Sequence, residues 1–171
     1  MNEDMKIIRE INLEAERFYD KAQALGNHAY QAFKDKRRAQ LTGLESIAES
    51  SLKTSDILDY IKKQIARSDP GKDWRAEGKE DTVTDESQQG FGERLKTYLE
   101  QNLSDRLNIV CSNVGIVTKV EKGKSKQDSE IERAKLKADR WKRQEIHVRL
   151  IREFIRQMVV QYEYRAGEGG E

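Results

Sequence analysis

Cysteine, proline and long apolar runs are nearly missing from this chain of 171 residues. The single cysteine, Cys111, excludes an intramolecular disulfide and favours a reducing compartment. No apolar run approaches the roughly 20 residues that span a bilayer, and the first residues are too polar and acidic for a secretory signal. With Pro70 as the only proline, few helix breakers remain. We therefore expect a helical, cytoplasmic protein that has no membrane partner.

An excess of one charge is also lacking. The chain holds 32 basic and 31 acidic residues, so its formal net charge is only +1, and no global field favours a polyanion. Hydrophobic residues make up 36% and charged residues 37% of the sequence. Most helices must therefore be half exposed, with a narrow apolar stripe that faces a small core or a partner.

Apolar residues recur at helical spacing through most of the chain. This pattern predicts one all-α domain over residues 1–166, a small helical bundle of four to five helices. The first stripe continues to Leu25, where Gly26 either ends the helix or lies within it. The final helix should begin near Asp128 or Ser129. Its predicted apolar face consists of Trp141, Val148, Ile151, Phe154, Ile155, Met158, Val159 and Tyr162.

Three segments lack this periodicity. Residues 69–92 are polar, acidic and rich in glycine, which predicts a long flexible loop that Trp74 anchors to the body. Residues 119–128 read as a basic linker, and residues 167–171 as a disordered tail. Before the loop, a helix should start with Thr54 or Ser55 as its N-cap and stop before Pro70.

Residues that commonly hold metals or act as nucleophiles are scarce. The two histidines, His28 and His147, lie far apart in sequence, and there is no cysteine pair, no H-E-x-x-H and no glycine-rich phosphate loop. Cys111 is expected to be a small buried apolar residue. The sequence therefore predicts no cofactor, no metal site and no enzymatic activity.

One spacing keeps an enzymatic alternative open. Arg140 and His147 are separated by six residues, which resembles in spacing the Arg and His pair of small helical RNases of the HEPN class. In such a pair one group moves the 2′-hydroxyl proton while the other steadies phosphate charge. The simpler interpretation is that His147 is half buried at the edge of the apolar stripe and Arg140 is solvated.

Charge is distributed unevenly along the chain. Residues 119–156 hold 13 basic and 7 acidic side chains, or 13 − 7 = +6, whereas residues 69–105 hold 5 and 10, or 5 − 10 = −5. A basic terminal helix can lie along a phosphate backbone, and Trp141 among the cations can stack on a base or a guanidinium. Alternatively, these cations form an ordinary solvated face, or the acidic loop docks on them.

Two pieces of the sequence carry a family resemblance. They are "SLKTSDILDYIKKQ", residues 51–64, and "HVRLIREFIRQMVVQYEYRAG", residues 147–167. Together they resemble the small helical subunit of type III CRISPR effector complexes. The resemblance implies a non-catalytic subunit whose copies stack head to tail along the guide–target duplex and hold backbone phosphates. Within these pieces it points first to Arg149 and Arg152.

Three hypotheses follow from these patterns. The leading one is a non-catalytic small helical subunit of a ribonucleoprotein complex, CRISPR-associated and antiviral, which contacts RNA, other protein subunits and further copies of itself. The second is a HEPN-type RNase or toxin that uses Arg140 and His147. The third is a helical adaptor that binds protein and no nucleic acid. The predicted nucleic-acid contacts are Arg149, Arg152, Arg156, Lys142, Arg143, Arg140, Lys62, Lys63, Arg37 and Arg38.

Overall fold

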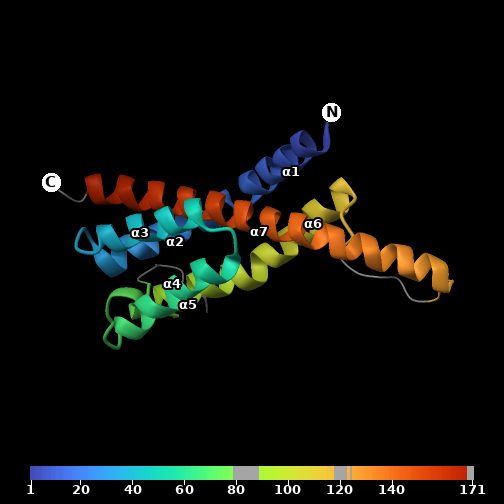
Figure 1. Ribbon diagram of the computed structural model, residues 1–171. Coiled ribbons are helices and arrows are strands. Elements are labelled where there is room, and N and C mark those ends of the chain that lie inside the picture. The colour runs from blue at the N-terminus through green and yellow to red at the C-terminus, as the bar shows by residue number, and fades with distance from the viewer. Residues whose placement is uncertain (79–88, 118–122, 124, 169–171) are drawn as a thin grey trace.

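The computed structural model describes residues 1–78, 89–117, 123 and 125–168, and these residues form an all-α fold (Figure 1). The elements are α1 (Glu3–Arg17), α2 (Tyr19–Phe33), α3 (Arg38–Ser50), α4 (Thr54–Arg67), the 3₁₀ turn η1 (Asp73–Arg75), α5 (Phe91–Thr97), the π turn η2 (Tyr98–Asn102), α6 (Leu103–Val114) and α7 (Lys126–Glu168). Because α5, η2 and α6 follow one another without a break, the described residues make six helical rods. The all-α class is confirmed, but the predicted count of four to five helices was too low.

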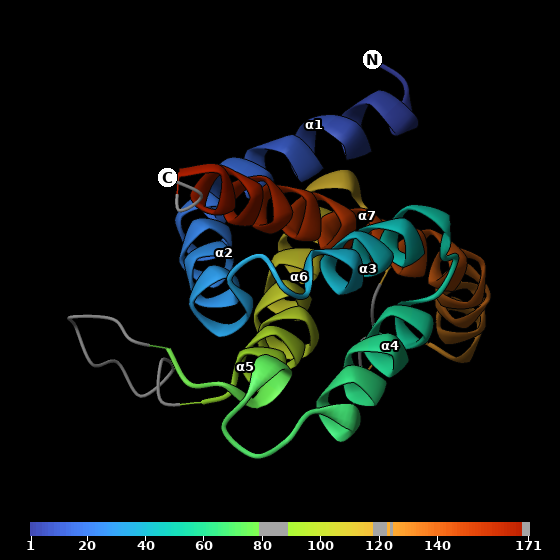
Figure 2. The same ribbon diagram turned by 90° about the vertical axis from the view of Figure 1, so that its left-hand side faces the viewer.

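The longest element, α7, is the central helix against which most of the other helices pack. Its 43 residues correspond to roughly 65 Å of helix. It contacts α1, α2, α3, α4 and α6, and Figure 2 shows α1 crossing it on one side while α3 and α4 lie on another. From Ile146 to Tyr162 its inward face is buried in one continuous hydrophobic core. The start of α7 instead extends past the other helices at one end of the molecule (Figure 1).

The additional helix arises from a break that the sequence does not signal. The chain leaves helical geometry at Phe18, with φ −95° and ψ 3°, and the buried Phe18 ring packs edge-on against Phe154 at 5.5 Å between centroids. Gly26 lies inside α2, where a Cβ would stand 2.6 Å from the carbonyl oxygen of Met158. Glycine there lets α2 approach α7 closely, so this residue is a helix contact rather than a helix end.

The region around Pro70 agrees with the sequence in part. Helix α4 ends at Arg67, before Pro70, as predicted, but its N-cap residue is Lys53, and no side chain caps it by a hydrogen bond. The prediction that Thr54 or Ser55 caps α4 was therefore wrong. Trp74 anchors the following loop as expected, because it is buried and its Nε1 donates to Gln40 Oε1 at 2.7 Å.

The boundaries of α7 differ slightly from the predicted ones. The helix begins at Lys126, so residues 126–128 belong to it rather than to the basic linker. At its other end it includes Gly167 and Glu168, which the sequence placed in the disordered tail. Parts of three predicted segments lie outside the described residues. They are residues 79–88 of the loop, residues 119–122 and 124 of the linker, and residues 169–171 of the tail.

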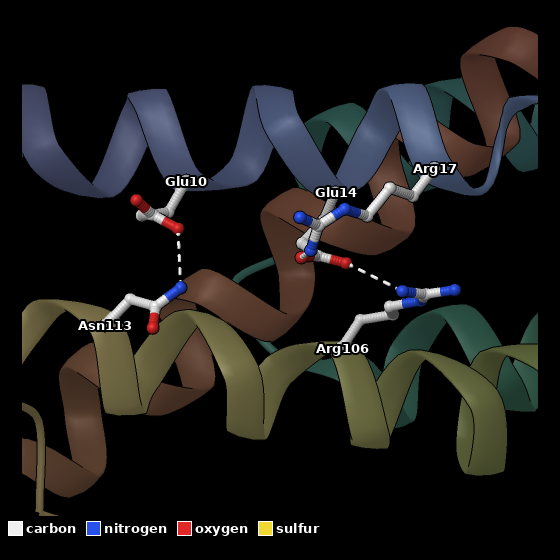
Figure 3. Close-up of polar contacts among 5 residues, drawn as sticks. All are labelled: Glu10, Glu14, Arg17, Arg106 and Asn113. Atoms are coloured by element: carbon white, nitrogen blue, oxygen red, sulfur yellow. Dashed lines mark hydrogen bonds and ion pairs between the residues drawn. The ribbon is translucent and has the colours of Figure 1, made fainter.

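A polar cluster fixes α1 against α6 (Figure 3). Glu14 is fully buried, and its carboxylate accepts hydrogen bonds from Arg17 at 2.6 Å and Arg106 at 3.1 Å. Glu10 accepts another from the amide of Asn113 at 2.8 Å. A buried carboxylate needs such charged partners, because removing an ion from water is costly. These contacts hold α1 in place along one flank of α7.

Cys111 is buried as predicted, and burial raises the pKa of its thiol, while the nearby Arg143 guanidinium opposes that shift. Across the described ranges, no helix combines the length and the apolar character that a membrane crossing requires.

Candidate nucleic-acid interface

The strongest local excess of positive charge lies on the extended start of α7. Residues 133–143, which we call the basic arm, contain six cations and one carboxylate, or 6 − 1 = +5. The cations are Arg133, Lys135, Lys137, Arg140, Lys142 and Arg143. The first four are exposed. The helix forms here because the residues are good helix formers and Asp128 lies in the first turn, where a negative charge suits the helix dipole.

Three cations of the basic arm share one face. Arg133, Lys137 and Arg140 stand at i, i+4 and i+7, which places them on one line along the helix, about 10 Å long at 1.5 Å per residue. Within the part of the chain that the structure describes, none of the three forms a hydrogen bond or ion pair. Their donors therefore remain available to a partner.

The other charged groups of the basic arm contact the body. Asp139 is buried, and its Oδ2 accepts a hydrogen bond from the Val117 amide at 3.0 Å, so its charge does not reach the exposed face. Lys142 pairs with Glu3 at 2.8 Å, and this hydrogen bond raises the pKa of the Lys142 ammonium. Arg143 reaches Asn108 at 3.5 Å. These contacts orient the helix and leave the Arg133–Lys137–Arg140 line facing solvent.

A groove begins where the basic arm meets the body. It has a volume of about 250 Å³ and is lined by Ser51, Leu52, Trp141, Glu145, Val148, Arg149 and Arg152. A second hollow of about 200 Å³ shares Trp141, Glu145 and Arg149 and is bounded by α1 through Glu3 and Asp4. We call the first hollow the Trp141 groove. Trp141 was predicted to lie on the apolar face of the helix, but it is 60% exposed, which corrects that prediction.

The arginines that the resemblance favoured are bound within the body. Arg152 donates to the carbonyl oxygens of Ala48 at 2.6 Å and Ser51 at 3.0 Å, so it caps the end of α3. Arg149 pairs with Glu145 at 3.0 Å and Arg156 with Glu153 at 2.8 Å, each about one turn away on α7. Their binding roles stay predictions, and the geometry gives Arg152 a structural task.

The structure does not gather the other predicted contacts around the basic arm. Arg37 pairs with Asp73 at 3.2 Å and Arg38 with Glu163 at 2.9 Å, near the C-terminal end of α7. Lys62 lies 3.9 Å from Asp59, and Lys63 is an exposed neighbour on α4. Because Lys62 and Lys63 occupy one helix and Arg37 and Arg38 another region, they form separate small clusters.

Arg140 and His147, the pair of the RNase hypothesis, lie in different environments. Arg140 is exposed, whereas His147 is half buried and its Nε2 donates to the Leu99 carbonyl at 3.2 Å. Burial lowers the pKa of His147, an effect that the hydrogen bond to Leu99 opposes and the Arg143 charge reinforces. This contact gives His147 a place in helix packing, as the simpler interpretation expected.

The second histidine, His28, is held inside the core. His28 is fully buried, with Nε2 donating to the Ala76 carbonyl at 2.9 Å and Nδ1 accepting from Arg94 at 3.2 Å. Among the described residues, no group of three histidine, cysteine or acidic side chains is arranged to hold a metal ion.

Comparison of the chain with protein-family models found no match, and neither curated proteins nor solved structures gave a significant one. The function is therefore inferred from the residues of the site.

Two features of the site were missed from the sequence. Arg133 is not among the predicted contacts, although its i, i+4, i+7 relation to Lys137 and Arg140 is visible in the sequence. Leu52, which is 68% exposed beside Trp141 in the groove, gave no signal, because only the tertiary contact between the α3–α4 link and α7 brings the two together.

Proposed function

We propose that the protein is a non-catalytic helical subunit of a ribonucleoprotein complex that holds a nucleic-acid backbone along its basic arm. The observation that carries this proposal is the line of Arg133, Lys137 and Arg140, three exposed cations without a protein partner in the described chain. Cations on one helix face bind phosphates without reading sequence. The CRISPR-associated, antiviral setting follows from the resemblance of residues 51–64 and 147–167 and stands as part of the proposal.

The proposal assigns protein contacts to a different surface. The outward face of α1 exposes Met5, Ile8 and Leu13, and Met1 before the helix is exposed as well. These side chains border a hollow of about 540 Å³. Exposed apolar side chains that cluster in this way are typical of protein interaction surfaces. This face would contact another subunit or a further copy of the chain in the cytoplasm. The same observation supports the adaptor hypothesis, in which the chain binds protein and no nucleic acid.

A comparison of two triple variants with the same charge change tests the proposal. One variant carries Arg133→Glu, Lys137→Glu and Arg140→Glu on the basic arm, and the other carries Lys62→Glu, Lys63→Glu and Arg67→Glu on α4. Binding of a short oligouridylate is measured by fluorescence anisotropy between about 50 and 200 mM salt. We expect the basic-arm variant to lose most affinity and the slope of log K against log salt to shrink by about 2, since each phosphate contact contributes about 0.7.

The α4 variant serves as the matched control and should keep most of its affinity. Equal losses in both variants would mean that net charge, not the basic arm, governs binding. Unchanged binding in the basic-arm variant would refute the proposed interface. If the wild-type chain binds no oligonucleotide but binds a protein partner that ignores these substitutions, the adaptor is the better account.

A further inference from the structure

The two tryptophans of the chain have opposite environments. Trp74 is 1% exposed, donates to Gln40, and packs against Phe33 and Phe91. Trp141 is 60% exposed and, within the described residues, makes neither a hydrogen bond nor a ring contact. A solvent-exposed indole forgoes the large gain from burying an aromatic side chain. Such a side chain is therefore a good candidate for contact with a ligand.

The surroundings of Trp141 combine an apolar surface with fixed cations. In the Trp141 groove, Leu52 and the buried Val148 add apolar lining beside the indole. The guanidinium of Arg152 is held by two backbone carbonyls, and that of Arg149 by Glu145. Both side chains are only partly buried. A guanidinium has five N–H donors, so each keeps donors that these contacts do not use.

The groove is continuous with the basic arm. Trp141 follows Arg140 directly and stands one turn after Lys137 on the same helix, so a strand whose phosphates lie along the arm passes the indole. Aromatic side chains next to a cationic track are how proteins bind single strands, because bases stack on the ring while the backbone follows the charges. One negative side chain, Glu145, also lines the groove, which disfavours a bare phosphate as its main occupant.

We propose that the Trp141 groove takes an unpaired nucleobase of a single-stranded RNA, stacked on the indole, while Arg149 contacts the adjoining phosphate. This inference rests on the proposed function, because the strand must first be held on the basic arm. It adds a base contact that carries affinity without strong sequence preference, since every base has a π-face.

Two oligomers of equal length separate the base contact from the backbone contact. One is a short oligouridylate, and the other is its abasic counterpart, which keeps the ribose-phosphate backbone and lacks the bases. The wild-type chain should bind the oligouridylate about tenfold more tightly, since stacking on an aromatic residue is of that size. Trp141→Ala should remove this preference and leave the affinity for the abasic oligomer unchanged.

Matched variants and a spectroscopic signal complete the test. Trp141→Phe should keep part of the preference, and Ile131→Ala, which removes another exposed apolar side chain from α7, should keep all of it. The oligouridylate should quench the tryptophan fluorescence of the wild-type chain but not that of Trp141→Phe, in which only the buried Trp74 remains.

Three results would overturn the inference. Equal affinity of the wild-type chain for both oligomers would leave the backbone contact, and with it the proposed function, but reject the base contact. Binding of neither oligomer would reject both. If Trp141→Ala left oligouridylate binding intact and instead weakened association with a protein subunit, the groove would be a protein interface.

Discussion

The two halves of α7 differ in how much of their surface is buried against other helices. From Ile146 onward, apolar residues at helical spacing are buried against α1, α2 and α3. In residues 126–138 the large apolar side chains are Ile131 and Leu136 only, and Ile131 is mostly exposed. One continuous helix thus carries a half that builds the core and a half that extends from it.

Stability and binding can therefore depend on different parts of the same helix. Burial of apolar surface is the main favourable term in folding, so the core-forming half should tolerate little change. The exposed cations Arg133, Lys137 and Arg140 of the basic arm bury little surface, so their replacement should cost little folding free energy. Substitutions in the first half should therefore change binding, and substitutions in the second half should change stability.

The largest expected effect is on the core side of the comparison. Phe154 is fully buried between Phe18 and Tyr98, with ring centroids at 5.5 and 4.4 Å. Phe154→Ala should lower the free energy of unfolding by about 3–5 kcal/mol, because it leaves a cavity in the packed core. Ile131→Ala on the exposed half should change it by less than about 0.5 kcal/mol. Urea unfolding followed by circular dichroism measures both, and similar losses would erase the distinction between the halves.

An intermediate effect is expected at Arg152, where sequence and structure assign different tasks. Its two hydrogen bonds to the carbonyls of Ala48 and Ser51 close the end of α3. Arg152→Met keeps the aliphatic stem but removes these donors, so it should cost about 1–2 kcal/mol of unfolding free energy. Arg156→Met is the control. Because Arg156 pairs with Glu153 near the surface of α7, this substitution should cost less than about 0.5 kcal/mol. Equal costs would count against a capping role.

The smallest effect is a dependence of stability on pH. Burial lowers the pKa of His147 in the folded chain, whereas in the unfolded chain it should lie near 6.5. Below about pH 6.5 the unfolded chain therefore binds more protons, and the free energy of unfolding falls as the pH falls. His147→Gln should flatten this dependence below about pH 6.5. An unchanged pH profile in the variant would show that other groups set it.

Prediction from sequence succeeded where one local pattern determines the structure. The apolar spacing from Val148 to Tyr162 identified the buried face of α7, and Pro70 marked the limit of α4. It failed where distant residues decide. The helix breaks at Phe18, whose ring packs on Phe154. Gly26 lies within α2, because a side chain at this position would collide with α7.

The candidate site shows the same division. The basic character of residues 133–143 could be read from the sequence, because charge is a property of composition. The engagement of Arg152 could not, because it binds backbone carbonyls more than 100 residues away. The pair of Glu145 and Arg149, in contrast, has the i, i+4 spacing that can be seen in the sequence. Exposure of Trp141 also depends on where α1 and the α3–α4 link end beside α7.

Mapping of photochemical crosslinks tests the central claim most directly. The full chain is bound to an oligonucleotide that contains 4-thiouridine, irradiated, digested, and analysed by mass spectrometry for peptides that carry a nucleotide. We predict crosslinks within residues 133–143, with Trp141 among the modified positions. Crosslinks confined to α4 or to residues 34–38, with none on the basic arm, would contradict the account.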